Sequence, residues 1–243
     1  MKMYRLGILA MPFVFLLFSS FKHKTSFSVG EPIVLPTNIT DGELNTKIYT
    51  YKLLYDEFLE KGFKMPSIEV FDQGVSGMKF LKRKGLIKKD ILTLIDFSKS
   101  SNEKRLWIID LTSKNILFRG YVAHGKNSGE EYPIKFSNKP QSYKSSLGFY
   151  KTAETYIGKH GYSLRLDGLE NGINNNARER AIVLHGADYV SKTFISKNKR
   201  LGRSHGCPAV SMKDHKKVIN LIKQGSCLFI YHPSAWYRQR TKI

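Results

Sequence analysis

Short apolar runs separated by glycine-, serine- and asparagine-rich segments make up the chain from about residue 91 onward. Runs of roughly four to eight β-favouring residues bounded by turn formers are typical of strands in a sheet core. We therefore predict a last strand after Gly225 and earlier strands at residues 91–97, 106–111, 115–124, 147–155, 164–166 and 181–184. Before the last strand, Ser211 and Asp214 resemble a capping box, and the helix it opens has one apolar stripe: Val218, Leu221 and Ile222.

Helical periodicity dominates only the region before these strands, residues 42–90. One helix is predicted there by apolar residues at helical spacing, with Gly62 as its stop: Leu44, Ile48, Tyr51, Tyr55, Phe58 and Leu59. A second helix is predicted over residues 75–84, between Gly74 and Gly85. We expect this region to pack on the strand-rich part, with its apolar stripe in the core. The predicted fold class is mainly β with flanking helices (α+β).

Residues 1–41 have a different character. Lys2 and Arg5 precede an apolar stretch at residues 6–18, which is short for a permanent membrane anchor. This pattern predicts a secretory signal peptide over residues 1–20, with an uncleaved anchor as the alternative. No cysteine follows the stretch, which argues against a lipoprotein anchor, and the polar residues 21–41 are predicted to be a flexible leader. We therefore expect an exported protein of the periplasm or cell envelope.

The charge balance is strongly basic, with 40 Lys and Arg against 20 Asp and Glu and a net charge of +20. Such a balance favours polyanionic partners, of which nucleic acid is the first to consider. Export would remove the protein from nucleic acid, so we expect no such partner. Peripheral contact with wall polymers or an anionic membrane surface fits the charge better. We found no repeat of fixed period, and we expect a monomer.

The candidate nucleophile is Cys207, which lies among glycine, histidine and hydroxyl groups in residues 203–208. A thiol attacks as its thiolate, so it needs a base or a positive field nearby. We rank His185 first as the base, because it follows the apolar run 181–184 and the glycine after it predicts a turn that carries the imidazole out of the strand. His205 ranks second: in an extended segment, residues two apart share a face.

Two glycines contribute to this candidate site. Gly186 follows the proposed base. Gly206 lets the backbone approach a substrate closely, and it can aim its own amide and that of Cys207 at a developing oxyanion. Together, these residues point to acyl transfer.

The residues also carry a family resemblance. His185-Gly186 followed by Ser204-His205-Gly206-Cys207, with the upstream segments 136–138, 145–150, 158–166 and 184–190, resembles the murein L,D-transpeptidase catalytic domain family, a divergent branch of the bacterial L,D-transpeptidases. The resemblance covers about residues 92–231. It implies a mixed β-sandwich catalytic domain over residues 91–243, no cofactor, no metal, and peptidoglycan stem peptides as substrate.

The resemblance also implies roles for individual residues. Cys207 would be the nucleophile, His185 the base, and the Gly186 carbonyl the group that orients the imidazole. Amides around His205, Gly206 and Cys207 would form the oxyanion hole.

The chain departs from the family pattern directly after the nucleophile. The usual ending Gly-Cys-Ile/Val-Arg reads here as Gly206-Cys207-Pro208-Ala209, without the arginine. Arg203 is our candidate to take over the function of that arginine, and Ser204 and Tyr189 are candidates for substrate contact. Asp188 could complete a Cys-His-Asp triad, but we expect it to be a solvated aspartate in a loop.

Several alternatives remain open from the sequence. With water as acceptor, the same residues give an L,D-carboxypeptidase or endopeptidase. A non-catalytic peptidoglycan-binding protein would leave Cys207 inert. A zinc peptidase could be built on His185, His205, Cys207 and His215, but it lacks a recognisable zinc-peptidase spacing. Cys227 lies in the last apolar run and is expected to be a core residue. A disulfide between Cys207 and Cys227 would consume the proposed nucleophile, so we predict that both cysteines are free thiols.

Overall fold

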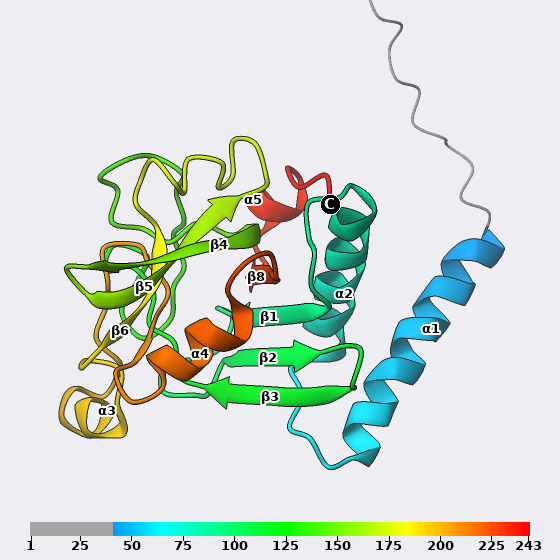
Figure 1. Ribbon diagram of the computed structural model, residues 1–243, viewed down its shortest axis with the longest axis horizontal. Coiled ribbons are helices and arrows are strands. Elements are labelled where there is room, and N and C mark those ends of the chain that lie inside the picture. Colours follow the sequence, from blue (N-terminus) through cyan, green and yellow to red (C-terminus); the bar gives the residue numbers. More distant parts are fainter. Residues whose placement is uncertain (1–40) are drawn as a thin grey trace, which may run out of the picture. The chain divides into compact units, whose positions relative to one another are not determined.

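The computed structural model describes residues 41–243 of the chain, with side chains from residue 51 onward (Figure 1). The predicted signal peptide and nearly all of the predicted leader lie outside the described residues. Two helices come first, α1 (Asp41–Glu60) and α2 (Ile68–Arg83). The strands are β1 (Ile91–Asp96), β2 (Leu106–Asp110), β3 (Asn115–Gly120), β4 (Gly148–Gly158), β5 (Gly161–Gly168), β6 (Val183–Ala187), β7 (Ala209–Ser211) and β8 (Cys227–Tyr231). Three further helices are α3 (Lys192–Asn198), α4 (His215–Ile222) and α5 (Ala235–Arg238).

The eight strands form one sheet in the order β3-β2-β1-β8-β4-β5-β6-β7. Strand β8 pairs in parallel with β1, and β6 pairs in parallel with β7, while the other neighbours are antiparallel. The two ends of this order approach each other, because Ala123, just after β3, bridges Ala209 of β7. The sheet is therefore nearly closed, and the predicted fold of mainly β structure with flanking helices is confirmed.

Strand β8 lies at the centre of the core. All five of its residues are buried, and the ring of Phe229 stacks on that of Phe149 in β4 with centroids 4.1 Å apart. Cys227 opens this strand as a fully buried free thiol, and Cys207 is also free. The predictions of a core strand at this position and of two free thiols are confirmed.

Helix α2 begins earlier than predicted, at Ile68 rather than near residue 75, and Ser67 caps it by accepting a hydrogen bond from the Val70 amide at 3.5 Å. The prediction failed because it took Gly74 as a helix boundary. Gly74 and Gly77 instead lie inside the helix, where it packs closely on the sheet. A Cβ at Gly74 would lie 2.4 Å from Leu94 Cδ2, and one at Gly77 would lie 2.0 Å from Phe149 Cζ.

Other boundaries also differ from the prediction. Helix α1 runs through the predicted stripe and is followed by Gly62 at φ 75°, but Leu59 is 47% exposed. The short strand β7 and helix α3 were not predicted. Strand β6 continues through Ala187, so His185 lies within a strand and not in a turn after it. The prediction that His185 leaves the strand is wrong because Gly186 and Ala187 pair with β7.

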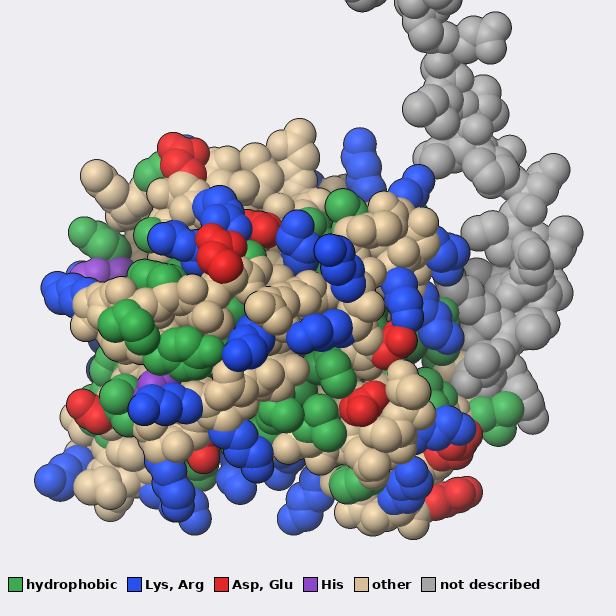
Figure 2. Space-filling view, in the orientation of Figure 1, with side chains coloured by type: hydrophobic (Ala, Val, Ile, Leu, Met, Phe, Trp, Pro, Cys, Tyr) green, Lys and Arg blue, Asp and Glu red, His purple; other side chains and the backbone are tan. Residues whose placement is uncertain are grey.

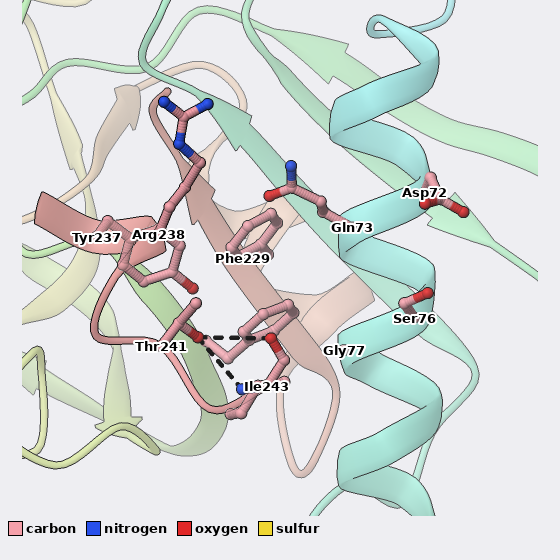
Figure 3. Close-up of a pocket in the computed structure, with 10 residues that line it drawn as sticks. Asp72, Gln73, Ser76, Gly77, Phe229, Tyr237, Arg238, Thr241 and Ile243 are labelled. Carbon is pink, nitrogen blue, oxygen red and sulfur yellow. Dashed lines mark hydrogen bonds between the residues drawn. The ribbon is translucent and has the colours of Figure 1, made fainter. Parts of the chain in front are cut away.

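The C-terminal segment packs beside α2 and encloses a cavity of about 290 Å³ (Figure 3). Buried Glu170 holds this segment, accepting hydrogen bonds from Tyr237 Oη at 3.0 Å and Thr241 Oγ1 at 2.6 Å. This cavity contains none of the predicted site residues. Within residues 41–243, no helix has the length and apolar character needed to cross a membrane.

Candidate active site

Six of the predicted site residues line a single cavity of about 160 Å³: His185, Tyr189, Arg203, Ser204, His205 and Cys207. Strand β6 contributes His185, and the loop between α3 and β7 contributes residues 203–205 and Cys207. We call residues 203–208 the nucleophile loop. A seventh lining residue, His160 in the turn between β4 and β5, was not among the predicted site residues.

The imidazole of His185 is buried and held in one orientation. Its Nδ1 lies 2.9 Å from the Gly186 carbonyl oxygen. A carbonyl oxygen can only accept, so Nδ1 carries the hydrogen in the neutral ring and Nε2 keeps a lone pair. Burial lowers the pKa of His185, and the nearby His160 and His215 lower it further, against the opposing effect of the Gly186 carbonyl. At neutral pH the ring is therefore uncharged and able to accept a proton.

Gly186 allows β6 to pack closely against the start of α4. A Cβ at this position would lie 2.7 Å from Met212 Sδ and 2.8 Å from His215 Cγ. The ring of His215 is fixed in turn, with its Nδ1 2.7 Å from the Met212 carbonyl oxygen. A larger residue in place of Gly186 would push the strand that carries His185 away from this helix.

Cys207 is half-buried, and its Sγ donates a weak hydrogen bond to the Ala181 carbonyl oxygen at 3.7 Å. Burial raises the pKa of the thiol, while a hydrogen bond from the Val183 amide and the charge of Arg180 act in the opposite direction. The site therefore rests as a neutral thiol and a neutral imidazole lining one cavity. A base must take the thiol proton when the sulfur attacks.

The nucleophile loop is held by hydrogen bonds from serine side chains. Ser204 Oγ donates to the Cys207 carbonyl oxygen at 2.6 Å and accepts from the Gly206 amide at 3.0 Å. Ser145 Oγ donates to the Gly206 carbonyl oxygen at 3.0 Å. The Gly206 amide, expected in the oxyanion hole, is thus already engaged within the loop.

The remaining predicted residues surround the thiol in different ways. Arg203 Nη1 donates to Glu130 Oε1 at 2.5 Å and to the carbonyl oxygens of residues 126 and 129, so it fastens the nucleophile loop to a neighbouring loop. His205 is exposed, with its ring centroid 4.7 Å from that of Tyr143. Tyr189 is half-buried, and burial raises its pKa to about 12.

Asp188 is exposed, and the Nδ1 atom that a triad carboxylate would hold is bonded to the Gly186 carbonyl instead. Among the side chains that the structure describes, those of residues 51–243, no three His, Cys, Asp or Glu gather as metal ligands would.

His160 stacks on His185, with ring centroids 4.2 Å apart and an interplanar angle of 21°. It also lines a second cavity of about 410 Å³, together with Tyr189, Lys159, Asp188 and Met212. The sequence offered only one signal for His160, its place in the resembling segment 158–166. The stacking depends on strand pairing that brings two distant residues together.

The chain is similar to a known protein family. A model described as the L,D-transpeptidase catalytic domain matches residues 64–231, starting earlier than the expected residue 92 because it includes α2. No curated protein sequence matches significantly.

Among solved structures, an L,D-transpeptidase from Mycobacterium smegmatis has 11% identity and a TM-score of 0.37, with 59% of each chain covered. An L,D-transpeptidase from Mycobacterium tuberculosis H37Rv has 14% identity and a TM-score of 0.34, with 59% of this chain and 58% of that chain covered. A mutant of the helical cell shape determining protein Pgp2 from Campylobacter jejuni has 12% identity and a TM-score of 0.42, with 65% and 53% covered. The chain thus spans less than two thirds of the length of each of these proteins.

Proposed function

The chain belongs to the L,D-transpeptidase catalytic domain family, and from this premise we propose that it is a cysteine L,D-transpeptidase acting on the stem peptides of peptidoglycan. Membership in this family supports an activity of the L,D-transpeptidase type on peptidoglycan. One structural observation carries the more specific proposal. The Cys207 thiol and the His185 imidazole line the same small cavity, and the imidazole has its basic nitrogen free of the Gly186 hydrogen bond.

In the proposed first half-reaction, His185 Nε2 takes the proton of Cys207 as the sulfur attacks the carbonyl carbon at the L-centre of a diamino acid. The resulting tetrahedral intermediate collapses when the bond to the following D-residue breaks. The imidazolium returns its proton to the departing amine, which leaves a thioester on Cys207.

In the second half-reaction, the amine of a neighbouring stem peptide attacks the thioester. His185 takes a proton from this amine and gives it to the sulfur as the new amide forms. The result is a cross-link and a regenerated enzyme. If water takes the place of the amine, the same steps give a carboxylic acid, and the enzyme is then an L,D-carboxypeptidase or endopeptidase.

The electrostatics of the site favour this general-base mechanism over a preformed ion pair. Burial raises the pKa of the thiol and lowers that of the imidazole, so both groups are neutral before substrate binds. In a neutral pair, the proton moves only as the new bond forms. We also propose, from the N-terminal residues, that the protein works in the cell envelope.

Intact-protein mass spectrometry of the full chain tests the proposal. The chain is incubated with a carbapenem, and separately with a tetrapeptide donor. We expect a covalent adduct at Cys207 in the wild type and none in Cys207→Ala. Cys227→Ala is the matched control, because Cys227 is the other free thiol and is fully buried.

The products distinguish the acceptors. Release of the terminal D-residue with formation of a peptide dimer supports the transpeptidase, whereas release without a dimer supports the hydrolase. Equal adduct formation by the wild type and Cys207→Ala would rule out Cys207 as the nucleophile. The absence of an adduct with an alkylatable thiol would favour a non-catalytic peptidoglycan-binding protein.

A further inference from the structure

The segment directly before β6, residues 180–182, packs against the nucleophile loop. The thiol of Cys207 reaches the Ala181 carbonyl oxygen. A Cβ on Gly206 would lie 3.2 Å from Ile182 Cδ1 and 3.5 Å from Arg180 Nη2. Ala181 has φ 52°, in the left-handed region that costs a non-glycine residue about 1 kcal/mol. Strain of this kind persists only where the surroundings enforce it.

The side chain of Arg180 holds this segment with four hydrogen bonds. Its Nη1 donates to the Ser137 carbonyl oxygen at 2.7 Å and to Ser146 Oγ at 2.5 Å. Its Nη2 donates to the Lys144 carbonyl oxygen at 2.7 Å and to Ser142 Oγ at 3.3 Å. All four partners are neutral groups, so these hydrogen bonds hold the guanidinium in place without cancelling its charge.

The nucleophile motif has no cation after the cysteine, because Pro208 and Ala209 stand there. The candidate we named from the sequence to fill this gap, Arg203, is paired with the carboxylate of Glu130 at 2.5 Å. A guanidinium that already neutralises a carboxylate adds little positive field at the sulfur. Arg180, in contrast, lies beside Gly206 and has only neutral partners among the contacts given above.

We propose that Arg180 is a positioning residue for Cys207: it fastens residues 137–146 to the segment before β6, which packs against the nucleophile loop, and it provides the positive field that stabilises the thiolate. The inference concerns the same thiol as the proposed function but does not depend on the substrate. Its two parts, tether and charge, can be separated by substitution.

Electrostatics agree with the geometry. Burial raises the pKa of the Cys207 thiol, and the charge of Arg180 acts in the opposite direction. Burial lowers the pKa of Arg180, and Tyr150 and Cys207 act in the opposite direction. Other titratable and charged groups facing the thiol or the guanidinium are His160, His185, Tyr189, Arg203 and His205 around the cavity, and Tyr150 in β4. They are unchanged in the variants below, so a difference between variants reports on residue 180.

The test is the pH dependence of alkylation of the full chain by iodoacetamide, which needs no peptidoglycan. Cys227 is fully buried, so the reaction reports on Cys207. Arg180→Met removes the charge and should raise the midpoint pH of alkylation by about one unit, the lower end of the effect of a nearby opposite charge. Arg180→Lys keeps the charge but cannot hold Ser146 and Lys144 together, and should raise the midpoint by about half as much.

Two variants serve as controls. Arg178→Gln breaks an exposed ion pair with Glu154 and should leave the midpoint unchanged. Ser146→Ala removes one tether but no charge, so it should lower the melting temperature while the midpoint stays close to that of the wild type. If the midpoint rises in Ser146→Ala as much as in Arg180→Met, the charge of Arg180 has no effect of its own on the thiol, and that part of the proposal is overturned.

A folded Arg180→Met protein with the wild-type midpoint overturns the proposal. If Arg180→Met does not fold, Arg180→Gln takes its place, because it also removes the charge, and an unchanged midpoint in that variant overturns the proposal. A shifted midpoint together with no acyl-enzyme in the wild type would uphold the role of Arg180 and reject the proposed function, so the two failures can be told apart.

Discussion

Strand β8 and the nucleophile loop each hold one of the two cysteines, but opposite kinds of interaction fix them. In β8 every side chain is buried, and the backbone pairs with β1 and β4. Burial alone raises the pKa of Cys227. In the nucleophile loop, hydroxyl groups of Ser204 and Ser145 bond to the backbone on both sides of a half-buried thiol. Apolar packing immobilises a thiol and keeps it inert, whereas polar tethers immobilise it and leave it open to reactants.

The largest effect is expected at the base. His185→Gln should lower the rate of acylation of Cys207 by about 100- to 10,000-fold, because it removes the group that takes the thiol proton. His205→Gln is the matched control in the exposed part of the same site, and we expect a loss of less than about tenfold there. Stopped-flow measurement of carbapenem acylation gives both rates. A greater loss in His205→Gln would make His205 the base.

The next largest effect is expected on stability, from a substitution in the core where α2 packs on the sheet. Gly77→Ala should gain about 1 kcal/mol of helix propensity but force a methyl group against the Phe149 ring, so we expect a net loss of about 2 kcal/mol in the free energy of unfolding. Ser76→Ala, in the same helix, should be close to neutral. Urea denaturation measures both, and the folded variants should acylate at wild-type rates. Stabilisation by Gly77→Ala would show that α2 can move away from the sheet.

A smaller effect is expected from a single tether. Ser145→Ala leaves the Gly206 carbonyl and the Gly125 amide without their hydroxyl partner, so we expect a loss of about 1–2 kcal/mol in stability and about tenfold in acylation rate. Ser113→Ala, which removes an exposed hydroxyl bonded to Asp110, should change neither quantity. An unchanged acylation rate in Ser145→Ala would show that the backbone alone positions the nucleophile loop.

The smallest effect concerns the pH profile. The acylation rate should fall at low pH, where His185 becomes protonated. Because the pKa of His185 is lowered in the folded protein, we expect this fall at a pH below the ordinary pKa of an imidazole. His160→Phe keeps a stacked ring but removes a positive charge that disfavours the His185 imidazolium. The pKa of His185 should then rise, and the pH at which the acylation rate falls should increase by about a few tenths of a unit. A shift to lower pH would contradict this electrostatic role of His160.

The core was more predictable from the sequence than the site. Apolar runs indicated most of the strands, because a strand buried on one face or on both has alternating or continuous apolar residues in its sequence. Helix α3 has no such pattern in its sequence, since its residues Lys192–Asn198 include no buried side chain. The start of α2 was missed because Gly74 and Gly77 serve close packing against residues that are distant in sequence.

At the site, the sequence indicated the candidate reactive groups but not what holds them. Cys207 and His185 were proposed from local composition and motif. Arg180 and Ser145 act through hydrogen bonds to residues far away in the sequence, across 34 residues from Arg180 to Ser146 and 61 residues from Ser145 to Gly206. A single sequence carries no signal for such partners.

The parallel pairing of β6 with β7 places His185 directly opposite Ala209, two positions after Cys207. The spacing of base and nucleophile is therefore set by strand register and not by the length of the connection between them, which includes α3. Insertions or deletions in residues 190–200 can remodel the approach to the cavity while the reacting groups keep their alignment. A shift of one residue in register would turn the imidazole to the opposite face of the sheet. For protein engineering, this crossover is the place to graft new specificity, and the β6–β7 pair is the part to leave intact.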